Sequence, residues 1–370
     1  MKILTVVGAR PNFVKIASLE KAFRPYRHVR FIIVHTGQHY DASLDDIFFR
    51  QLDIPEPDFH LGVGSDTPAR QLGKMLLGLE PILEQKQPDV VLVVGDTTSA
   101  LAGALAASGK HIKVAHVEAG LRSGDRSMPE EINRILTDTV SDFLFVTEQA
   151  GLENLRIQLS ENSAQQIFFT GNCMIDTLVQ FREQASLTGA VQKSGLSPKN
   201  YALVTLHRPS NVDTEAGLKI VLTILETISE DIPVLFPLHP RTAASLEKIG
   251  LTSRLQVIER LRVIEPQGYL EFLNLMGNAA LVLTDSGGVQ DETTFLGVPC
   301  LTLRTTTERP VTIDLGTNEL ILKPGTNTIR QKIRQILSGQ WKTGTKPALW
   351  DGQSARRIAE ILINISAQNH

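Results

Sequence analysis

The segment DVVLVVGDTTS, residues 89–99, decides the fold. A run of aliphatic residues leads directly into a glycine, a carboxylate and three hydroxyl side chains. A short apolar run that ends in turn residues is typical of a strand buried in a parallel sheet. The polar cluster then stands at the carboxyl end of that strand, where open α/β sheets bind their ligands. The segment therefore predicts a parallel α/β fold with a site at the strand ends.

The same pattern recurs through the first half of the chain. Apolar, β-branched runs stand at residues 2–7, 30–35, 112–117 and 143–146. Between them lie helical patterns such as residues 72–85, whose apolar positions return every three or four residues. Strands alternating with helices predict βαβ units and a doubly wound parallel sheet.

A second sheet is expected after a polar, weakly patterned stretch at 187–200. The alternation restarts there, with strands expected at 201–207, 233–239, 280–285 and 298–303. We therefore expect two Rossmann-like domains, residues 1–171 and 172–353, with a helix at 354–370 packing back onto the first. Two such sheets in tandem predict a ligand cleft between them.

The composition points to a protein that binds small molecules. The 370 residues include 37 basic and 40 acidic side chains, a net charge of −3, and 42% are hydrophobic. Without basic runs, the chain lacks the positive patch that nucleic-acid or anionic-membrane binding requires. The start resembles no secretory signal and no apolar run is long enough to span a membrane, so a cytoplasmic protein is expected. Cys173 and Cys300 are too few and too far apart to predict a disulfide framework or a zinc site.

The motif DSGG at 285–288 predicts a phosphate-binding turn. Ser286, Gly287 and Gly288 lie between an apolar strand and a helix, so the backbone N–H groups of the helix start can face an anion. A capped strand-to-helix turn is the alternative. Arg309, after the next strand, favours the anion site because guanidinium binds diphosphates in a bidentate manner. Arg10, at the end of the first strand, is a candidate for the same anion or for a surface ion pair.

Two further residues in the second half are candidates for contacts with a nucleoside. Glu292 lies six residues after Ser286, too far into the helix to cap it, and as an acceptor-only carboxylate it suits the paired hydroxyls of a ribose. Phe272 is a candidate for stacking on a base, although an aromatic residue on an apolar helical face more often belongs to the core.

Carboxylates gather at the expected strand ends of the first half. Asp96 and Glu118 each follow a buried strand, where burial can raise the pKa of a carboxyl group towards neutral pH. Glu130 and Glu131 follow Pro129 at the start of a helix. For Glu130, an ion pair with Arg134 four residues later is the alternative to a catalytic role. From the second half, His207 follows a strand in the motif TLHR.

Taken in order along the whole chain, these motifs resemble one family, the non-hydrolysing UDP-N-acetylglucosamine 2-epimerases. The motifs that carry the resemblance are GARPxxxK, GDTTS, HVEAGLRSGDRSMPEEINR, TLHR, LTDSGGVQDE and TTTERP. The resemblance implies a glycosyltransferase-B-type fold of two domains, interconversion of UDP-N-acetylglucosamine and UDP-N-acetylmannosamine without a redox cofactor or metal, and a homodimer.

The resemblance also assigns roles to residues of this sequence. It places UDP against Arg10, Ser286, Gly287, Gly288, Glu292 and Arg309, with Phe272 near the uracil. It gives catalytic and sugar-side positions to Lys15, Asp96, Glu118, Glu130, Arg134 and His207. Three positions depart from the commonest bacterial pattern, namely Asn12, Ser210 and Asp41. Asn12 and Ser210 each replace a glutamate and bear on sugar specificity. Asp41 bears on a regulatory second UDP-sugar site.

The chemistry of such a reaction is consistent with these residues. The hydrogen on carbon 2 of the sugar has no adjacent carbonyl to acidify it, and no GxGxxG motif follows a strand to hold a redox nucleotide. Elimination of UDP to a bound 2-acetamidoglucal, followed by re-addition, avoids both obstacles. It requires stabilisation of a departing diphosphate and at least two acid/base groups, with Asp96 and Glu118 the first candidates and His207 an anion stabiliser.

Other functions remain open from the sequence. The same scaffold suits epimerisation of a modified sugar such as a UDP-diacetamido-glucuronate. A hydrolysing epimerase is disfavoured because the TERP motif is retained. A retaining glycosyltransferase shares the fold but has no need for the first-half carboxylates, and a non-catalytic UDP-sugar sensor would not depend on Asp96, Glu118 or His207.

Overall fold

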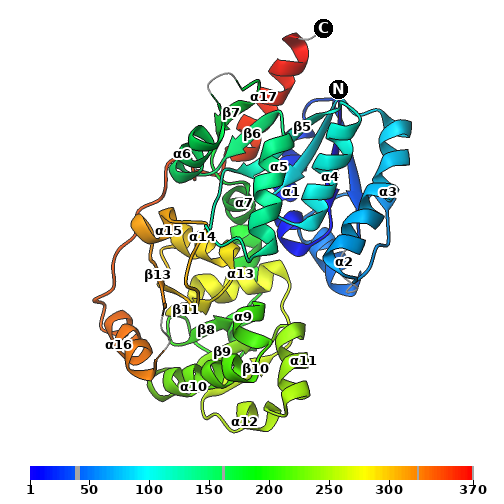
Figure 1. Ribbon diagram of the computed structural model, residues 1–370. Coiled ribbons are helices and arrows are strands. Elements are labelled where there is room, and N and C mark those ends of the chain that lie inside the picture. The colour runs from blue at the N-terminus through cyan, green and yellow to red at the C-terminus, as the bar shows by residue number, and fades with distance from the viewer. Residues whose placement is uncertain (38–41, 161–162, 323–324, 369–370) are drawn as a thin grey trace. The chain divides into compact units, whose positions relative to one another are not determined.

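The computed structural model describes residues 1–37, 42–160, 163–322 and 325–368 (Figure 1). The chain divides into two compact units, Met1–Gln180 with Ala348–His370, and Phe181–Pro347. Helix α7 (Cys173–Leu187) continues through the first of these boundaries. The stretch at 187–200, expected to be weakly patterned, contains only the end of α7 and the short helix α8 (Ala190–Lys193).

The first unit contains a seven-stranded parallel sheet in the order β3-β2-β1-β4-β5-β6-β7. Its strands are β1 (Lys2–Val7), β2 (Arg30–His35), β3 (Phe59–His60), β4 (Val90–Val94), β5 (Lys113–Ala119), β6 (Phe143–Val146) and β7 (Gln166–Phe169). The central strands coincide closely with the apolar runs of the sequence, because both of their faces are covered by helices. The short edge strands β3 and β7 were not expected.

Helices of the first unit cover the sheet (Figure 1). They are α1 (Arg10–Phe23), α2 (Ala42–Gln51), α3 (Pro68–Lys86), α4 (Thr98–Gly109), α5 (Pro129–Val140), α6 (Gln149–Gln158), most of α7, and α17 (Ser354–Gln368). Alternate residues of each strand point to opposite faces. Accordingly Leu4 and Val6 of β1 pack with Met75 and Leu79 of α3 in one continuous core.

The C-terminal segment belongs to the first unit. Helix α17 packs against α1. The buried indole of Trp350 donates from Nε1 to the carbonyl of Thr147 over 3.0 Å, and the amide of Ala355 donates to Asp176 Oδ2 over 2.6 Å. These long-range bonds attach residues 348–368 to the sheet from which the first 180 residues are built.

The second unit repeats the architecture with six parallel strands in the order β10-β9-β8-β11-β12-β13. The strands are β8 (Ala202–Thr205), β9 (Val234–Pro237), β10 (Leu261–Ile264), β11 (Leu281–Thr284), β12 (Cys300–Thr302) and β13 (Asn318–Leu320). The helices are α8 (Ala190–Lys193), α9 (Pro209–Val212), α10 (Glu215–Asp231), α11 (Pro240–Ile249), α12 (Thr252–Gln256), α13 (Tyr269–Asn278), α14 (Gly287–Leu296), α15 (Val311–Asp314) and α16 (Thr326–Leu337).

The strand orders locate the binding edges. In the first sheet β1 lies between β2 and β4, and in the second sheet β8 lies between β9 and β11. From β1 and from β8 the later strands are therefore added on both sides. Ligands of doubly wound sheets bind at this switch point, beyond the carboxyl ends of the strands. The expected pair of doubly wound parallel domains is confirmed. None of the helices in the described part of the chain has the length and apolar character needed to cross a membrane.

Candidate functional site

In the first unit, Lys15 and Glu118 meet at the switch point. Lys15 projects from the second turn of α1, and its Nζ forms an ion pair with Glu118 Oε2 near the end of β5. Both side chains are about 6% exposed. A Cβ on Gly95, at the end of β4, would lie 2.8 Å from that Nζ and 3.0 Å from that Oε2, so only glycine leaves room for the pair.

The backbone of Glu118 is strained. Its φ is +77°, in the left-handed region that residues with a Cβ rarely adopt. The register between β5 and β6 shifts between Val117 and Ala119, which marks a bulge at this residue. Strain of this kind costs about 1–3 kcal/mol and persists where surrounding contacts impose it. The bulge aims the Glu118 carboxylate at Lys15.

Asp96 lies one residue beyond Gly95 and is bound by α5. Arg134 Nη2 forms an ion pair with Asp96 Oδ2, and Asn133 Nδ2 donates to the backbone carbonyl of Asp96 over 2.9 Å. Arg134 is buried, whereas the Asp96 side chain is 26% exposed. Asp96 and Glu118, the first candidates for proton transfer, are each paired with a cation.

The two glutamates of the PEE motif have different surroundings. Glu131 is buried and accepts hydrogen bonds from the backbone amides of Ser123 and Gly124, over 2.9 and 3.1 Å, and from Arg134 Nη1 over 2.9 Å. Glu130 is half-buried in the first turn of α5. Arg134, considered from the sequence as a partner of Glu130, therefore pairs with Glu131, three residues before it, and with Asp96.

A buried histidine and aspartate lie behind these carboxylates. His116 Nδ1 is 2.7 Å from Asp138 Oδ1, and His116 Nε2 is 2.9 Å from the carbonyl of Gly95. Both side chains are fully buried. Burial acts to raise the pKa of Asp138, but His116 and Arg122 outweigh it and hold that pKa below its ordinary value. No local pattern singles out these residues, although His116 and Arg122 stand within the HVEAGLR motif.

Asn12, one of the departures from the bacterial pattern, holds the turn at the start of α1. Its Oδ1 accepts from the amides of Gly8 and Ala9 over 3.3 and 3.2 Å, and its Nδ2 donates to the carbonyl of Val94 over 2.9 Å. The side chain is buried. Asn12 therefore links the ends of β1 and β4. Arg10, two residues earlier, places its guanidinium carbon 5.9 Å from the centre of the Phe48 ring.

In the second unit, Asp285 organises the loop that carries His207. The buried Asp285 carboxylate accepts from the backbone amides of His207 and Arg208, over 3.1 and 2.9 Å, and from Asn211 Nδ2 over 2.9 Å. His207 Nδ1 lies 3.2 Å from Asp285 Oδ1, and its ring stacks on His239 with centres 4.9 Å apart. The aspartate of DSGG thus binds the β8–α9 loop.

The start of α14 and Arg309 come together as the motif predicts. Ser286 stands at the N-cap position of α14, and in the described structure its hydroxyl makes no capping bond to the helix. A Cβ on Gly287 would lie 2.7 Å from Arg309 Nη1 and 2.6 Å from Glu308 Oε1. Arg309 is itself buried and bonded through Nε to Asp291 and through Nη1 to Glu308, over 2.8 and 2.6 Å. Amide groups and a guanidinium therefore converge on one turn.

Glu292 is buried two turns into α14. Tyr269 Oη donates to its Oε1 over 2.9 Å. Burial raises the pKa of Glu292 to about 8, with the Tyr269 hydrogen bond opposing the shift and Asp291 adding to it. Burial therefore favours the protonated form of this carboxyl group, and its expected contact with ribose hydroxyls stays a prediction. Phe272, on α13, is half-buried.

The candidate residues thus form one group in each unit. Lys15, Asp96, Glu118 and Arg134 lie together in the first unit; Ser286, Gly287 and Arg309 lie together in the second. Gly288 is the second residue of α14, and Ser210 is exposed on α9. Asp41 lies outside the described residues. Within the described ranges, no group of three or more His, Cys, Asp or Glu side chains is arranged to hold a metal ion.

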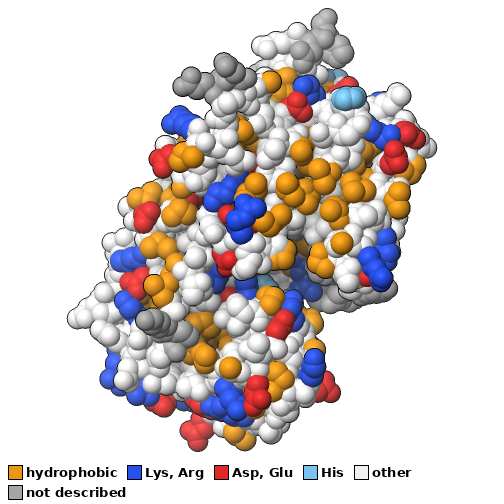
Figure 2. All heavy atoms as spheres, in the orientation of Figure 1, with side chains coloured by type: hydrophobic (Ala, Val, Ile, Leu, Met, Phe, Trp, Pro, Cys, Tyr) orange, Lys and Arg blue, Asp and Glu red, His pale blue; other side chains and the backbone are white. Residues whose placement is uncertain are grey.

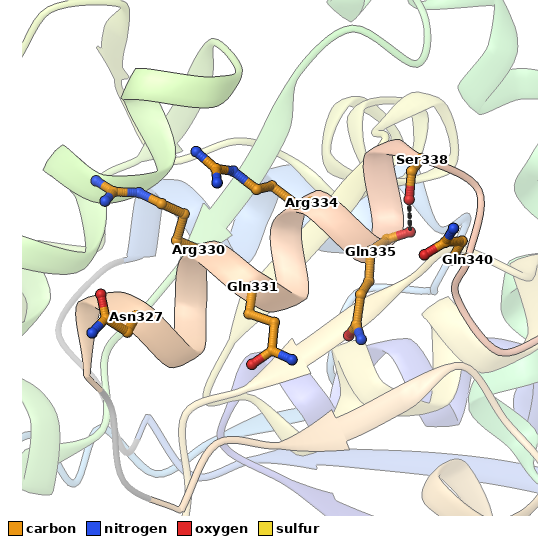
Figure 3. Close-up of a pocket in the computed structure, with 7 residues that line it drawn as sticks. All are labelled: Asn327, Arg330, Gln331, Arg334, Gln335, Ser338 and Gln340. Atoms are coloured by element: carbon orange, nitrogen blue, oxygen red, sulfur yellow. Dashed lines mark hydrogen bonds between the residues drawn. The ribbon is translucent and has the colours of Figure 1, made fainter.

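A surface hollow along α16 is separate from both groups. It is lined by Asn327, Arg330, Gln331, Arg334, Gln335, Ser338 and Gln340 (Figure 3). Arg330 forms an ion pair with Glu230, and Ser338 Oγ donates to the carbonyl of Gln335 over 3.1 Å. No residue that the sequence motifs single out lines this hollow.

Comparison with known proteins identifies the family. The family model described as UDP-N-acetylglucosamine 2-epimerase matches residues 21–363. The UDP-N-acetylglucosamine 2-epimerase of Methanocaldococcus jannaschii is 43% identical over 369 residues, which cover 98% of this chain and 99% of that protein. The UDP-2,3-diacetamido-2,3-dideoxy-D-glucuronate 2-epimerase of Pseudomonas aeruginosa is 42% identical over 367 residues, which cover 99% of this chain and 100% of that protein.

A solved structure supports the same assignment. The crystal structure of the M. jannaschii UDP-GlcNAc 2-epimerase in complex with UDP-GlcNAc and UDP superposes with a TM-score of 0.90 at 42% identity. The match covers 98% of this chain and 100% of that chain. The predicted glycosyltransferase-B-like pair of domains and the predicted family are both confirmed. The chain belongs to the UDP-N-acetylglucosamine 2-epimerase family and is an isomerase.

Proposed function

We propose that this protein interconverts UDP-N-acetylglucosamine and UDP-N-acetylmannosamine by eliminating and re-adding UDP. The observation that carries the proposal is the strained Glu118 carboxylate, held against Lys15 beside the Asp96–Arg134 pair. Strained, buried and charged residues at a strand end are typical of sites that move protons. The relatives named for this reaction over almost the whole chain support it.

The leaving group is assigned to the second unit. The turn at Ser286, Gly287 and Gly288 presents the amide groups of the α14 start, and the buried Arg309 guanidinium lies against Gly287. Amide dipoles and a fixed cation stabilise the charge that develops on a departing diphosphate. Arg10 of the first unit is proposed to contact the same diphosphate, and Glu292 and Phe272 to contact the nucleoside.

The reaction balances without an added oxidant or reductant. A base removes the proton from carbon 2, the C1–O bond to UDP breaks with its electron pair, and a C1=C2 double bond forms. Return of a proton to the opposite face of carbon 2 and attack of a UDP oxygen on carbon 1 complete the epimerisation. The residues needed are a base, an acid and a stabiliser of UDP, which the two groups supply.

Asp96, Glu118 and Glu130 are the proposed proton-transfer groups, and His207 the proposed anion stabiliser. Lys15 forms an ion pair with Glu118, and Arg134 forms one with Asp96. The proposed diphosphate ligands lie mainly in the second unit, and the proposed proton-transfer carboxylates lie in the first.

Solvent labelling tests the mechanism. In deuterium oxide, the product formed from UDP-N-acetylglucosamine should carry deuterium at carbon 2, because the abstracted proton exchanges before re-addition. Mass spectrometry and proton NMR of the product measure the label. Epimer formed without deuterium at carbon 2 would exclude elimination with an exchanging acid, and the absence of any epimer would reject the activity itself.

A second candidate substrate is a UDP-2,3-diacetamido sugar acid. The P. aeruginosa relative named for such a sugar is 42% identical, about as similar as the M. jannaschii relative. The Asn12 amide is bonded to the backbone of Gly8, Ala9 and Val94, so we do not expect it to distinguish the two substrates. Parallel kcat/KM measurements on both UDP-sugars decide between them, and a ratio above about 100 in favour of the acid would replace the first substrate.

We also propose that the protein acts as a homodimer, as the resemblance implies. Figure 2 displays hydrophobic side chains gathered over α3, α4 and α5. Among the exposed apolar residues are Leu77 of α3 and Leu136 of α5, 75% and 42% exposed. Light scattering of the purified protein should give twice the 40.7 kDa chain mass, and Leu77→Lys should lower it.

A further inference from the structure

The bulge at Glu118 needs a restraint, because a residue with φ of +77° is about 1–2 kcal/mol less stable than in an ordinary strand conformation. Its neighbour Gly120 also has a positive φ, +81°. A Cβ at Gly120 would lie 2.3 Å from the carbonyl oxygen of Gly151 at the start of α6, so the chain here is closely confined. Asn154 Nδ2 of α6 also donates to the carbonyl of Gly120 over 2.8 Å, so packing and a hydrogen bond both hold this side of the bulge.

Two further hydrogen bonds, one on each side of Glu118, lead to the same aspartate. Gly120 N donates to Asp138 Oδ2 over 3.1 Å, two residues after Glu118. His116, two residues before Glu118, contacts Asp138 Oδ1 through Nδ1 over 2.7 Å. A single carboxylate of α5 therefore binds the Gly120 amide on one side of Glu118 and the His116 side chain on the other.

The same histidine also holds the turn that carries Asp96. His116 Nε2 lies 2.9 Å from the carbonyl oxygen of Gly95, the residue before Asp96. The amide of Gly95 in turn donates to the carbonyl of Val117 over 2.9 Å. The ends of β4 and β5, which present Asp96 and Glu118, are thus joined through one imidazole ring.

The hydrogen-bond pattern also defines the groups that the His116 ring faces. The carbonyl of Gly95 only accepts, and Asp138 accepts from Gly120 and lies 2.7 Å from Arg122 Nη2. The lowered pKa of Asp138 agrees with an ionised carboxylate. Both ring nitrogens of His116 therefore face groups that accept hydrogen bonds.

From this geometry we propose that His116 and Asp138 are positioning residues, which hold Glu118 and Asp96 in the arrangement that proton transfer requires. Neither touches substrate, because both side chains are fully buried. The proposal rests on the epimerase function proposed above. A displacement of about 1 Å at a reacting group can lower a rate by about 100-fold, so a loose restraint should be visible in turnover.

The test compares three substitutions. His116→Gln keeps a donor but shortens the reach to one partner, Asp138→Asn removes the charge, and Asp142→Asn is the matched control. Asp142 binds the opposite end of the same strand, accepting from the amide of Val114 over 2.9 Å. We expect His116→Gln and Asp138→Asn to lower kcat at least tenfold with the Kd for UDP within about threefold of wild type. Asp142→Asn should lower the melting temperature but leave kcat within about twofold.

Equal kcat losses in the control and the test variants, or unchanged kcat in both test variants, would overturn the proposal. If neither test variant folds, a measurement on the wild-type protein still tests the proposed contacts of His116. Ring nitrogen NMR of histidine-labelled protein should find a non-exchanging N–H proton on one ring, and a His116 ring without such a proton would reject the geometry. That measurement does not depend on turnover, so it stays valid if the wild-type protein fails to epimerise and the proposed function is rejected instead.

Discussion

Lys15 of α1 and Glu118 of β5 stand 103 positions apart in the sequence and form a buried ion pair beside Gly95, which follows β4. Two charges removed from water are stable together only because each neutralises the other, and the loss of one leaves the other unpaired. The pair therefore links the folding of the first unit to the state of the proposed catalytic carboxylate.

Lys15→Met should destabilise the first unit by about 3–5 kcal/mol, because it leaves the Glu118 carboxylate buried without a counter-charge. The double variant Lys15→Met, Glu118→Gln should be more stable than Lys15→Met alone, since it removes both charges. Thermal unfolding of the three proteins measures this. If Lys15→Met melts within 1–2 °C of wild type, the buried pair does not exist in solution.

Glu130 and Glu131 should separate function from stability. Glu130→Gln is expected to lower kcat by about 10²- to 10⁴-fold with little change in melting temperature, as for the loss of a general acid or base. Glu131→Gln should lower the melting temperature, because Glu131 binds two amides and Arg134. Reversed results would transfer the catalytic role from Glu130 to Glu131.

The sequence predicts the central strands well for a physical reason. Strands β1 and β2 begin and end at the limits of their apolar runs, since a strand covered on both faces must be apolar throughout. The edge strands β3 and β13, of two and three residues, carry no such run and were not predicted. An edge strand is stabilised by one neighbour and the loops around it, which leave little pattern in the sequence.

The candidate site also contains some residues that the sequence predicts and others that it does not. Arg309 and Gly287 are predicted to belong to one site because a guanidinium and a glycine turn both bind anions. His116 and Asp138 are not predicted, because a histidine within a strand and an aspartate near a helix end acquire their roles only when β5 and α5 pack. The ionisation of Glu292 is also beyond the sequence, since it depends on complete burial beside Tyr269.

Burial of Glu292 should make stability fall as the pH rises. Its pKa is about 8 in the folded protein and 4.5 ordinarily, so between these values the folded state holds a proton that the unfolded state has released. The contribution is fully present below pH 4.5 and is lost as the pH rises through 8. Glu292→Gln removes it, so the melting-temperature difference between wild type and variant should shrink or reverse from pH 6 to pH 9. A constant difference would contradict the raised pKa.

Binding of UDP should release a proton near pH 7 through the same residue. If ribose hydroxyls donate to Glu292, they stabilise its ionised form and lower its pKa from about 8. Calorimetric titrations in buffers of different ionisation enthalpy measure the released fraction. Glu292→Gln should abolish the release, and an unchanged release in that variant would assign the proton to another group.

Gly287→Ala should weaken UDP binding through Arg309. The added methyl group would lie 2.7 Å from Arg309 Nη1 and 2.6 Å from Glu308 Oε1, so the guanidinium has to move away from the start of α14. Loss of one charged hydrogen bond costs about 1.5 kcal/mol or more, which corresponds to at least a tenfold rise in Kd.

Gly277→Ala is the matched control, because Gly277 lies in a helix and the nearest atom to its added Cβ is 4.0 Å away. The control should bind UDP as wild type does and melt at the same or a higher temperature, since alanine stabilises a helix by about 1 kcal/mol relative to glycine. Equal UDP affinities for Gly287→Ala and Gly277→Ala would place the diphosphate away from Arg309, because a site that uses this guanidinium has to register its displacement.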